Sequence, residues 1–332
     1  MKTEKLKTIP GFVDLQVNGF GGIDFSAENL GAGDLDTVAD SLNRAGTAAF
    51  LATLITSPLP VYRRNLALIG RALESPALHG RILGIHLEGP FLSPRKGYIG
   101  SHDPQHVLLP DVRLLQELWE ISGGTIRLLT MAAELPGAAE LAHRARELNI
   151  AVSIGHSAFD EQSLDTLVAC GATAITHLGN GLPNLIPRHH NPLWPGLAND
   201  AVSATIIADG FHLPPALLKT ILAVKGVSRT IVVSDLAPIA GLPAGNYRFA
   251  GQQVVLEPTG RIVNPKHKCL AGTGTTLLQA VNYLASLDLV SPADLVKLAF
   301  DNPLRLLGLQ PQDLHPTCRL CFTDGSFRIF ST

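Results

Sequence analysis

The sequence predicts an α/β protein whose main part is a (β/α)8 barrel of the TIM type, and three observations support this prediction. Short apolar runs, suited to strands buried on both faces, alternate along the 332 residues with segments of helical periodicity. Eight such units fit into about 230 residues, which favours a closed barrel over an open sheet. Ionisable residues directly follow several of the apolar runs, as expected where an active site lies at the carboxyl ends of barrel strands.

The eight predicted strands are β-branched or largely apolar. In chain order they are expected at residues 11–17, 48–55, 82–87, 125–131, 151–154, 173–177, 203–208 and 230–234. Helical patterns separate most of them, at residues 35–45, 61–73, 112–119, 138–148, 161–169 and 215–224. Asp160 and Pro214 directly precede the last two of these helices, where helix-starting residues are expected.

The chain after the eighth strand predicts three further features. Residues 245–268 combine turn signals with alternating apolar residues, which indicates a hairpin excursion. Segments 275–287 and 293–299 are expected to be closing helices. Residues 318–330 alternate around Asp324-Gly325, a dipeptide typical of hairpin turns, and predict a final pair of strands.

Composition excludes several functional classes. Hydrophobic residues make up 46% of the chain and charged residues 16%, which is unlike a disordered protein. The formal net charge of −2 gives no electrostatic basis for binding nucleic acid or an anionic membrane. The longest charge-free apolar stretch, residues 45–62, is broken by Gly46, Pro58 and Pro60, and no apolar region follows the first lysines. We therefore expect a cytoplasmic protein without a membrane span or a signal peptide.

Ionisable residues terminate five of the predicted strands, and in a barrel these ends meet on one face. The strand ends are His86-Leu87-Glu88, Gly155-His156-Ser157, Thr176-His177-Leu178, Asp209-Gly210-Phe211-His212 and Ser234-Asp235. A single histidine at a strand end is usually structural, but five convergent ends indicate an active site.

Three of these residues suit a metal. Two neutral imidazoles and one carboxylate form a typical catalytic Zn²⁺ site with a position left for water, and Glu88, His156 and His177 supply that set. A bound divalent ion lowers the pKa of its water, so that a hydroxide nucleophile is available at neutral pH. Asp235 follows the eighth strand, beside the first, and is placed to transfer the proton.

The end of the first strand predicts that only one metal is bound. Two-metal barrel hydrolases commonly have a His-x-His pair there, whereas this chain has Gln16 and Asn18. Neutral amides are poor ligands for a second transition metal. Zn²⁺ is the first expectation, although Fe²⁺, Co²⁺ or Mn²⁺ suits the same donors.

Six motifs in order carry a family resemblance. They are Pro10-Gly11-Phe12-Val13-Asp14-Leu15-Gln16-Val17-Asn18-Gly19, His86-Leu87-Glu88-Gly89-Pro90-Phe91, Gly155-His156-Ser157, Thr176-His177-Leu178, Ala208-Asp209-Gly210-Phe211-His212 and Ser234-Asp235. With them the chain resembles the N-acetylglucosamine-6-phosphate deacetylases of the amidohydrolase superfamily. The match covers residues 9–308, including Leu270-Ala271-Gly272 and Asn302-Pro303-Leu304-Arg305-Leu306-Leu307-Gly308.

The resemblance implies roles for the catalytic residues. Glu88, His156 and His177 would bind one divalent metal ion per subunit, and Asp235 would be the general base and later the general acid. The family's Lys-Gly-Ala-His-Asp-Pro is replaced here by a longer segment, Lys96 to Pro104, that contains His102. We expect His102 to polarise the substrate carbonyl; the alternative is a solvated loop histidine beside Asp103.

It also implies a set of substrate contacts. His212 matches the family histidine that touches the sugar phosphate and ring hydroxyls, and Asn180 and Gly181 fall where backbone amides help to hold the phosphate. Arg188 matches the phosphate-binding arginine that reaches in from the other subunit of a homodimer. His189 and His190 replace an acidic residue beside it, and this change could instead suit a carboxylate or an unphosphorylated sugar.

The resemblance implies a domain organisation as well. We expect a catalytic barrel of the metal-dependent hydrolase kind over residues 9–308 and a small β subdomain formed by residues 1–8 and 309–332. Family members carry a larger β-sandwich built from both chain ends, so this subdomain is expected to be reduced.

The predicted function is metal-dependent removal of the acetyl group from N-acetylglucosamine 6-phosphate, by metal-hydroxide attack with Asp235 as the base. A deacetylase or amidase for another small N-acylated amino sugar or amino acid, phosphorylated or not, is the alternative. A sugar-phosphate-binding protein without activity is disfavoured because all four metal and base positions are filled. A nucleobase deaminase or cyclic-amide hydrolase is disfavoured by the missing His-x-His pair.

Overall fold

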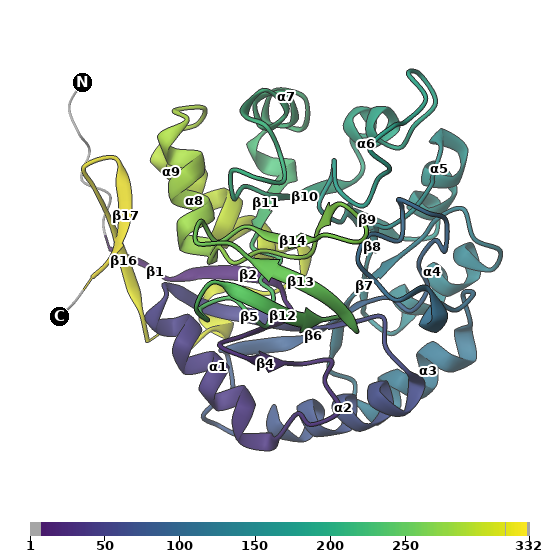
Figure 1. The fold of residues 1–332 in the computed structure, drawn as a ribbon, viewed down its shortest axis with the longest axis horizontal. Helices are drawn as coiled ribbons and strands as arrows, with labels where there is room; N and C mark the ends of the chain where they lie inside the picture. The colour runs from purple at the N-terminus through teal and green to yellow at the C-terminus, as the bar shows by residue number, and fades with distance from the viewer. Residues whose placement is uncertain (1–7, 316, 331–332) are drawn as a thin grey trace.

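Eight parallel strands form the barrel in the computed structural model, which describes residues 8–315 and 317–330. Their order in the sheet is β11-β10-β9-β8-β7-β6-β5-β2 (Figure 1). Their bounds are β2 Phe12–Val17, β5 Thr47–Ile55, β6 Ile82–Glu88, β7 Ile126–Met131, β8 Ala151–Ile154, β9 Ala172–Ile175, β10 Ser203–Ile207 and β11 Thr230–Val233. The predicted barrel is therefore confirmed, with every strand within two residues of its expected bounds.

The barrel closes between β11 and β2 through side chains and single bridges rather than through a continuous ladder. The amide of Leu236 donates to the carbonyl of Gln16 at 3.3 Å, and the amide of Asn18 donates to the carbonyl of Leu236 at 2.9 Å. Below them, the Asp14 carboxylate accepts hydrogen bonds from the backbone amide and the hydroxyl of Ser234. These contacts hold the carboxyl ends of the first and eighth strands side by side.

Helices cover the outer face of the barrel (Figure 1). They are α1 Ala32–Arg44, α2 Leu59–Ala72, α3 Val112–Ile121, α4 Ala138–Glu147, α5 Glu161–Ala169, α6 Leu193–Ala198, α7 Pro215–Lys225, α8 Leu277–Ser286, α9 Pro292–Val296 and α10 Asn302–Leu306. Asp160 caps α5 by accepting from the amide of Ser163 at 2.9 Å, and α7 begins after Pro214, as predicted. Helix α6 was not predicted, and the helix expected at 293–299 continues through a π-helical turn, Lys297–Asp301, into α10.

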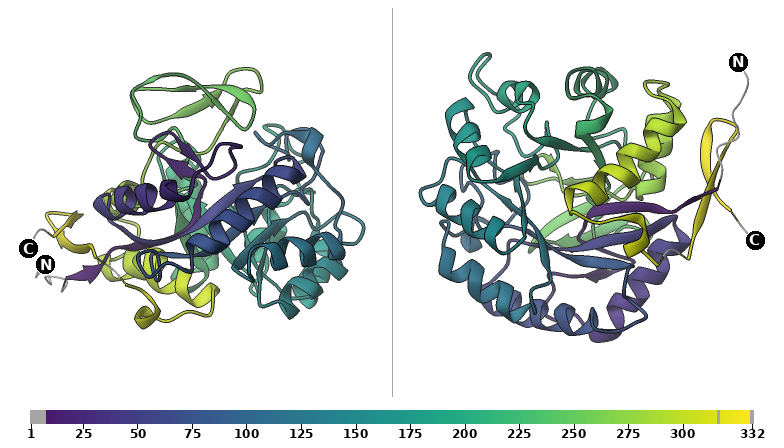
Figure 2. Two further views of the ribbon diagram at one scale, coloured as in Figure 1. Left: turned by 90° about the horizontal axis from the view of Figure 1, so that it is seen from below. Right: turned by 180° about the vertical axis from the view of Figure 1, so that it is seen from behind.

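Antiparallel strands form smaller sheets outside the barrel. The expected excursion is a four-stranded sheet of β12 Gly245–Phe249, β13 Gln252–Leu256, β14 Ile262–Asn264 and β15 Cys269–Leu270. This sheet forms a separate layer beside the barrel (Figure 2, left). Near the start of the chain, β3 Gly19–Phe20 pairs with β4 Ile23–Asp24.

The two ends of the chain meet in one sheet, as the predicted fold class requires. Strand β1 Ile9–Pro10 pairs with β16 Arg319–Thr323, and β16 pairs with β17 Ser326–Ile329 across a turn at Asp324-Gly325. Whether residues 1–8 and 309–332 form a subdomain apart from a barrel domain at 9–308 stays a prediction. Of these segments, residues 1–7, 316, 331 and 332 lie outside the described residues.

Three groups of buried apolar side chains hold these layers together. One fills the barrel interior, with Val13 and Leu51 among its members, and a larger one packs the helices against the sheet. The third joins Ile55 of β5 to Phe249 and Ile262 of the β12–β15 sheet, which docks that sheet onto the barrel. Within the described part of the chain, every helix is too short or too polar to cross a membrane.

Candidate metal centre and active site

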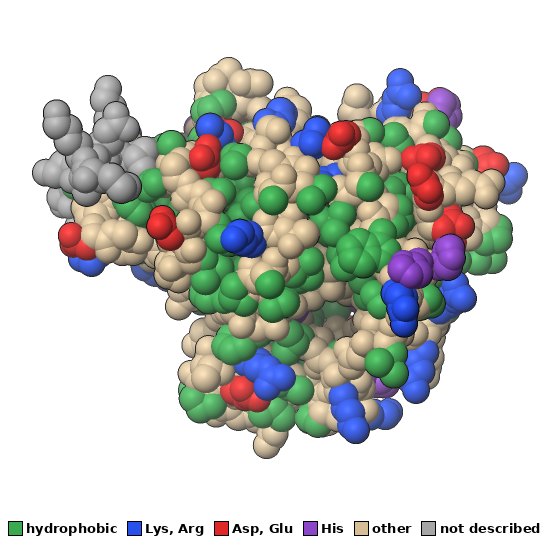
Figure 3. Space-filling view, turned by 90° about the horizontal axis from the view of Figure 1, so that it is seen from above, with side chains coloured by type: hydrophobic (Ala, Val, Ile, Leu, Met, Phe, Trp, Pro, Cys, Tyr) green, Lys and Arg blue, Asp and Glu red, His purple; other side chains and the backbone are tan. Residues whose placement is uncertain are grey.

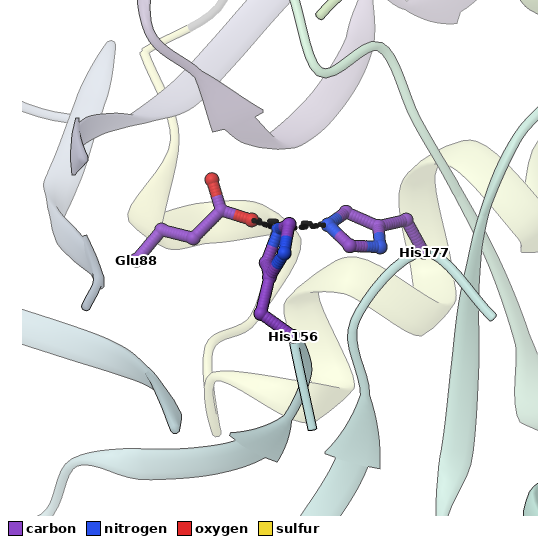
Figure 4. A group of neighbouring side chains, drawn as sticks. All are labelled: Glu88, His156 and His177. Carbon is purple, nitrogen blue, oxygen red and sulfur yellow. Dashed lines mark hydrogen bonds and ion pairs between the residues drawn. The ribbon is translucent and has the colours of Figure 1, made fainter. Parts of the chain in front are cut away.

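Glu88, His156 and His177 lie at the carboxyl ends of β6, β8 and β9 and point toward one another (Figure 4). All three are buried. His177 Nε2 is 3.1 Å from Glu88 Oε1 and 3.1 Å from His156 Nε2, and His156 Nε2 is 3.5 Å from Glu88 Oε1. Ligands about 2.1 Å from a tetrahedral Zn²⁺ ion lie roughly 3.4 Å from one another, so this set fits a single divalent ion.

The backbone and the hydrogen bonds around the cluster hold its donors in place. His156 Nδ1–H donates to the carbonyl of Tyr98 at 2.8 Å, which leaves the Nε2 lone pair directed at the cluster. His156, His177 and Asp235 have φ values of 47°, 35° and 51°. Such left-handed conformations cost a residue with a side chain about 1–3 kcal/mol and are concentrated at functional sites. They turn the chain sharply at the strand end and bring the side chains over the barrel.

The cluster also perturbs the pKa values of its members. Burial lowers the pKa of His177, although the hydrogen bond with Glu88 opposes this shift, and the neighbouring His156 adds to the lowering. Burial by itself would raise the pKa of Glu88, but its contacts with His156, His177 and His102 outweigh the effect of burial and hold the pKa well below its usual range. A neutral imidazole beside an ionised carboxylate is the protonation state that a divalent metal ion requires.

Asp235 lies next to this cluster and shares a hydrogen-bond donor with it. Asp235 Oδ1 accepts from Gln16 Nε2 at 3.0 Å and from Asn18 Nδ2 at 2.8 Å, and Gln16 Nε2 also donates to Glu88 Oε1 at 2.9 Å. Burial and the charge of Glu88 raise the pKa of Asp235 well above its ordinary value. Sequence reasoning treated Gln16 and Asn18 only as poor ligands and missed this role, although their i, i+2 spacing indicates a shared direction at a strand end.

His102 lies in the same group. Its side chain is buried, with Nδ1 3.1 Å from Thr56 Oγ1 and Nε2 3.2 Å from His156 Nε2. It is therefore not a solvated loop histidine. Burial and the charge of His156 lower the pKa of His102 to about 3, so that the ring is neutral at physiological pH. When the Thr56 hydroxyl donates to Nδ1, the proton of the neutral ring lies on Nε2 and is available as a donor.

A cavity of about 580 Å³ connects the strand ends with the β12–β15 sheet. Glu88, Asp235 and the three histidines described above line it on the barrel side. The molecular surface is hollowed beside a group of basic and histidine side chains (Figure 3). This volume is in the range of cavities that take up small-molecule ligands.

Three of the four predicted substrate residues line this cavity: Asn180, Gly181 and His212. The ring of His212 is held by Asp209, whose Oδ2 lies 2.7 Å from Nδ1. Arg188 is exposed on the segment between β9 and α6 and does not line the cavity of its own chain.

Two basic residues that sequence reasoning missed, Arg261 and Lys268, line the cavity from the β12–β15 sheet. The sequence indicated them only weakly, because it predicted a hairpin excursion at residues 245–268 but not that this segment packs over the active-site cavity.

Comparisons with known proteins find relatives that match most of this chain. No protein-family model matches the chain. The chain is 34% identical over 317 residues to the N-acetylglucosamine-6-phosphate deacetylase of Bos taurus, covering 91% of this chain and 74% of the relative. It is 29% identical over 300 residues to the N-acetylgalactosamine-6-phosphate deacetylase of Escherichia coli O157:H7, covering 90% and 78%. The crystal structure of the N-acetylglucosamine-6-phosphate deacetylase of Thermotoga maritima superposes with a TM-score of 0.84 at 27% identity, covering 96% of this chain and 85% of that one.

The fold and the site together define a hydrolase of the amidohydrolase type, a (β/α)8 barrel with a cluster of residues able to hold a metal ion at its strand ends. The length and identity of the match narrow this class further. The chain belongs to the N-acetylglucosamine-6-phosphate deacetylase family.

Proposed function

We propose that this chain hydrolyses the acetamide of N-acetylglucosamine 6-phosphate to glucosamine 6-phosphate and acetate. One observation carries the proposal: the buried cluster of Glu88, His156 and His177 lies next to Asp235, and one amide group, that of Gln16, is hydrogen-bonded to both carboxylates. The names of the relatives support the substrate.

Glu88, His156 and His177 would hold one divalent metal ion, with Zn²⁺ as the first candidate and Fe²⁺, Co²⁺ or Mn²⁺ as alternatives. When bound there, such an ion lowers the pKa of water and polarises the acetamide carbonyl. Gln16 and Asn18 stand where a second metal would need ligands, and both direct their amide N–H groups at Asp235. This arrangement supports a single ion.

Asp235 moves the proton in this proposal. Gln16 and Asn18 hold its Oδ1, which leaves Oδ2 to take a proton from the attacking water as the new C–O bond forms. Asp235 then gives this proton to the sugar nitrogen as the C–N bond breaks, and acetate and the amine are released. The raised pKa of Asp235, caused by burial and by the charge of Glu88, makes this carboxylate a stronger proton acceptor than an ordinary aspartate.

The remaining residues orient the substrate. His102 would donate from Nε2 to the carbonyl oxygen of the acetyl group, where negative charge develops. His212, fixed by Asp209, would contact the sugar, and the backbone amide of Gly181 would contact its phosphate. The backbone amide of Asn180 donates to the carbonyl of His177 at 2.8 Å, so Asn180 would contribute its side-chain amide instead. Contacts far from the amide hold it in line for attack.

The proposal is tested by acetate release from N-acetylglucosamine 6-phosphate and from unphosphorylated N-acetylglucosamine, with metal-loaded enzyme. We expect a preference of about 100-fold or more for the phosphorylated sugar, which corresponds to about 2.7 kcal/mol. No acetate from either sugar would refute the proposal. Equal rates with the two sugars would be compatible with the proposed metal site but would reject the preference for a phosphorylated substrate.

A second candidate substrate is N-acetylgalactosamine 6-phosphate. The observation that favours it is the 29% identity to a deacetylase of that sugar, close to the identity with the glucosamine enzymes. The two sugars differ at one ring hydroxyl. A third reaction, run in parallel with N-acetylgalactosamine 6-phosphate, separates them by the ratio of kcat/KM values.

We also propose a homodimer in which Arg188 of each copy serves the cavity of the other. Arg188 is exposed, and Leu185 on the same segment is 92% exposed, so both residues are accessible to a second copy of the chain. Light scattering gives the mass of the assembly, and a monomer would contradict this arrangement. Because a phosphorylated sugar does not cross membranes freely, we place the reaction in the cytoplasm.

A further inference from the structure

We infer that Arg261 and Lys268 of the β12–β15 sheet form an anion site in the wall of the active-site cavity and bind the phosphate of the substrate. The inference rests on the proposed function, because the phosphate belongs to the proposed substrate. It assigns that group to two side chains of the same chain, in addition to the predicted contacts of His212, Asn180 and Gly181.

The charges around the cavity are the first reason. Glu88 and Asp235 lie on its barrel side, and a phosphate monoester carries close to two negative charges at neutral pH. Among the described residues that line the cavity, Arg261 and Lys268 are the only ones with a permanent positive charge. A dianion in this space is therefore attracted by the two cations on the side of the β12–β15 sheet.

The second reason is the environment of Arg261. Its side chain is 44% exposed, and its ion pair within the described residues is with Glu257, at 3.4 Å between Nη1 and Oε1. An exposed pair of this kind contributes little and exchanges readily with a better partner. A phosphate offers that partner, because the guanidinium can donate two parallel hydrogen bonds to its oxygens.

The third reason is the backbone at Lys268. It lies in the turn between β14 and β15 with a φ of 53°, a conformation that favours glycine over lysine. The turn is held by the Asn264 side chain, whose Oδ1 accepts from the amides of Lys266 and His267 at 3.1 Å each. Lys268 thus lines the cavity from a position whose backbone conformation is disfavoured for lysine.

The sheet that carries both cations is fixed relative to the proposed catalytic residues. Gln252 Nε2 donates to the carbonyl of Ser101 at 2.9 Å, and Asn264 Nδ2 donates to Gln252 Oε1. Ser101 directly precedes His102, so one chain of hydrogen bonds links the β14–β15 turn to the segment over the metal cluster. Packing of Phe249 against Ile55 supports the same position. The two cations are thus carried by a sheet that is held in a fixed position in the cavity wall.

The test is the double variant Arg261→Gln/Lys268→Gly, in which glycine suits the backbone of residue 268. Two single variants are matched controls: Lys266→Ala in the same turn and Arg248→Gln on β12, neither of which lines the cavity. The measurements are kcat and KM for N-acetylglucosamine 6-phosphate and N-acetylglucosamine, and calorimetric binding of glucosamine 6-phosphate and glucosamine.

We expect the double variant to lose about 100-fold in kcat/KM for the phosphorylated substrate, mainly through KM, and to bind glucosamine 6-phosphate correspondingly more weakly. Values for the unphosphorylated sugars should change by no more than about threefold, as should all values for the controls. An unchanged affinity for glucosamine 6-phosphate in the double variant would overturn the inference.

The two proposals fail in different ways. If the wild type releases acetate equally from N-acetylglucosamine 6-phosphate and N-acetylglucosamine, the chain is a deacetylase, but Arg261 and Lys268 do not bind the substrate phosphate. If the wild type releases no acetate but binds glucosamine 6-phosphate, and the double variant does not bind it, the anion site is supported and the proposed reaction is rejected.

Discussion

Gln16 donates a hydrogen bond from Nε2 to Asp235 Oδ1 at 3.0 Å, across the seam where the first and eighth strands of the barrel meet. The same nitrogen donates to Glu88 Oε1 at 2.9 Å. An amide whose N–H groups face two carboxylates offers no lone pair to a cation between them. The first strand thus contributes a donor that positions the proposed base, Asp235, and the proposed metal ligand Glu88, rather than ligands of its own.

Asp235→Asn should lose most activity while keeping its metal. The amide can still fill the space between Gln16 and Asn18, but it cannot take a proton from water. We expect kcat to fall about 10²–10⁴-fold, with the metal content per chain unchanged. Acetate release and elemental analysis of the same sample provide the measurement. Near-normal turnover would rule out Asp235 as the base.

Gln16→Met should leave the fold intact but weaken both metal binding and catalysis, because the Gln16 amide is hydrogen-bonded to Glu88 and to Asp235. Methionine matches glutamine in length but donates no hydrogen bond to Asp235 or Glu88. Loss of a group that orients metal ligands typically costs about 10–100-fold in metal affinity or activity. Metal titration followed by kcat at saturating metal tests both effects. Unchanged metal affinity and unchanged kcat would show that the hydrogen bonds from Gln16 to Asp235 and Glu88 contribute nothing to function.

Removal of the metal should lower stability as well as activity. Glu88, His156 and His177 are buried donors that face one another, so an ion that binds only the folded chain stabilises it by about 2.7 kcal/mol at a hundred times its Kd. We expect chelation to lower Tm and added Zn²⁺ to restore it. In His177→Gln the metal-dependent part of the Tm shift should shrink strongly. Equal Tm shifts in the wild type and this variant would place the metal elsewhere.

Asp14 should make the protein more stable at pH 5 than at pH 7. Burial raises the pKa of Asp14 to about 6, although hydrogen bonds from Ser234 and Gln16 oppose the shift, whereas the unfolded value is near 3.8. Between these values the folded chain binds more protons than the unfolded chain, so the free energy of unfolding falls as the pH rises through this window. The contribution of Asp14 from pH 5 to pH 7 is about 1 kcal/mol.

Urea unfolding of the wild type and of Asp14→Asn at both pH values measures this contribution. The gain on going from pH 7 to pH 5 should be larger in the wild type by about 1 kcal/mol, because the amide does not titrate. Equal pH dependence in the two proteins would mean that Asp14 keeps an ordinary pKa.

The sequence by itself determined the barrel and the members of the metal cluster. Strand periodicity and apolar runs are local properties, and the carboxyl ends of parallel strands necessarily meet on one face. Glu88, His156 and His177 could therefore be grouped although they lie as far as 89 residues apart in the chain. The cap at Asp160 and the turn at Asp324-Gly325 were predictable for the same reason, since each depends on a few neighbouring residues.

Only the tertiary structure decided which polar groups surround that cluster. The contact of Gln16 with Asp235 spans 219 residues and requires the barrel to close, and the approach of Arg261 and Lys268 requires the β12–β15 sheet to dock on Ile55. Arg188, chosen by its position in a motif, lies outside the cavity of its own chain. Residue patterns record which face of an element is buried, but a hydrogen bond needs two atoms within about 3 Å, and that distance is set by the packing of elements far apart in the chain.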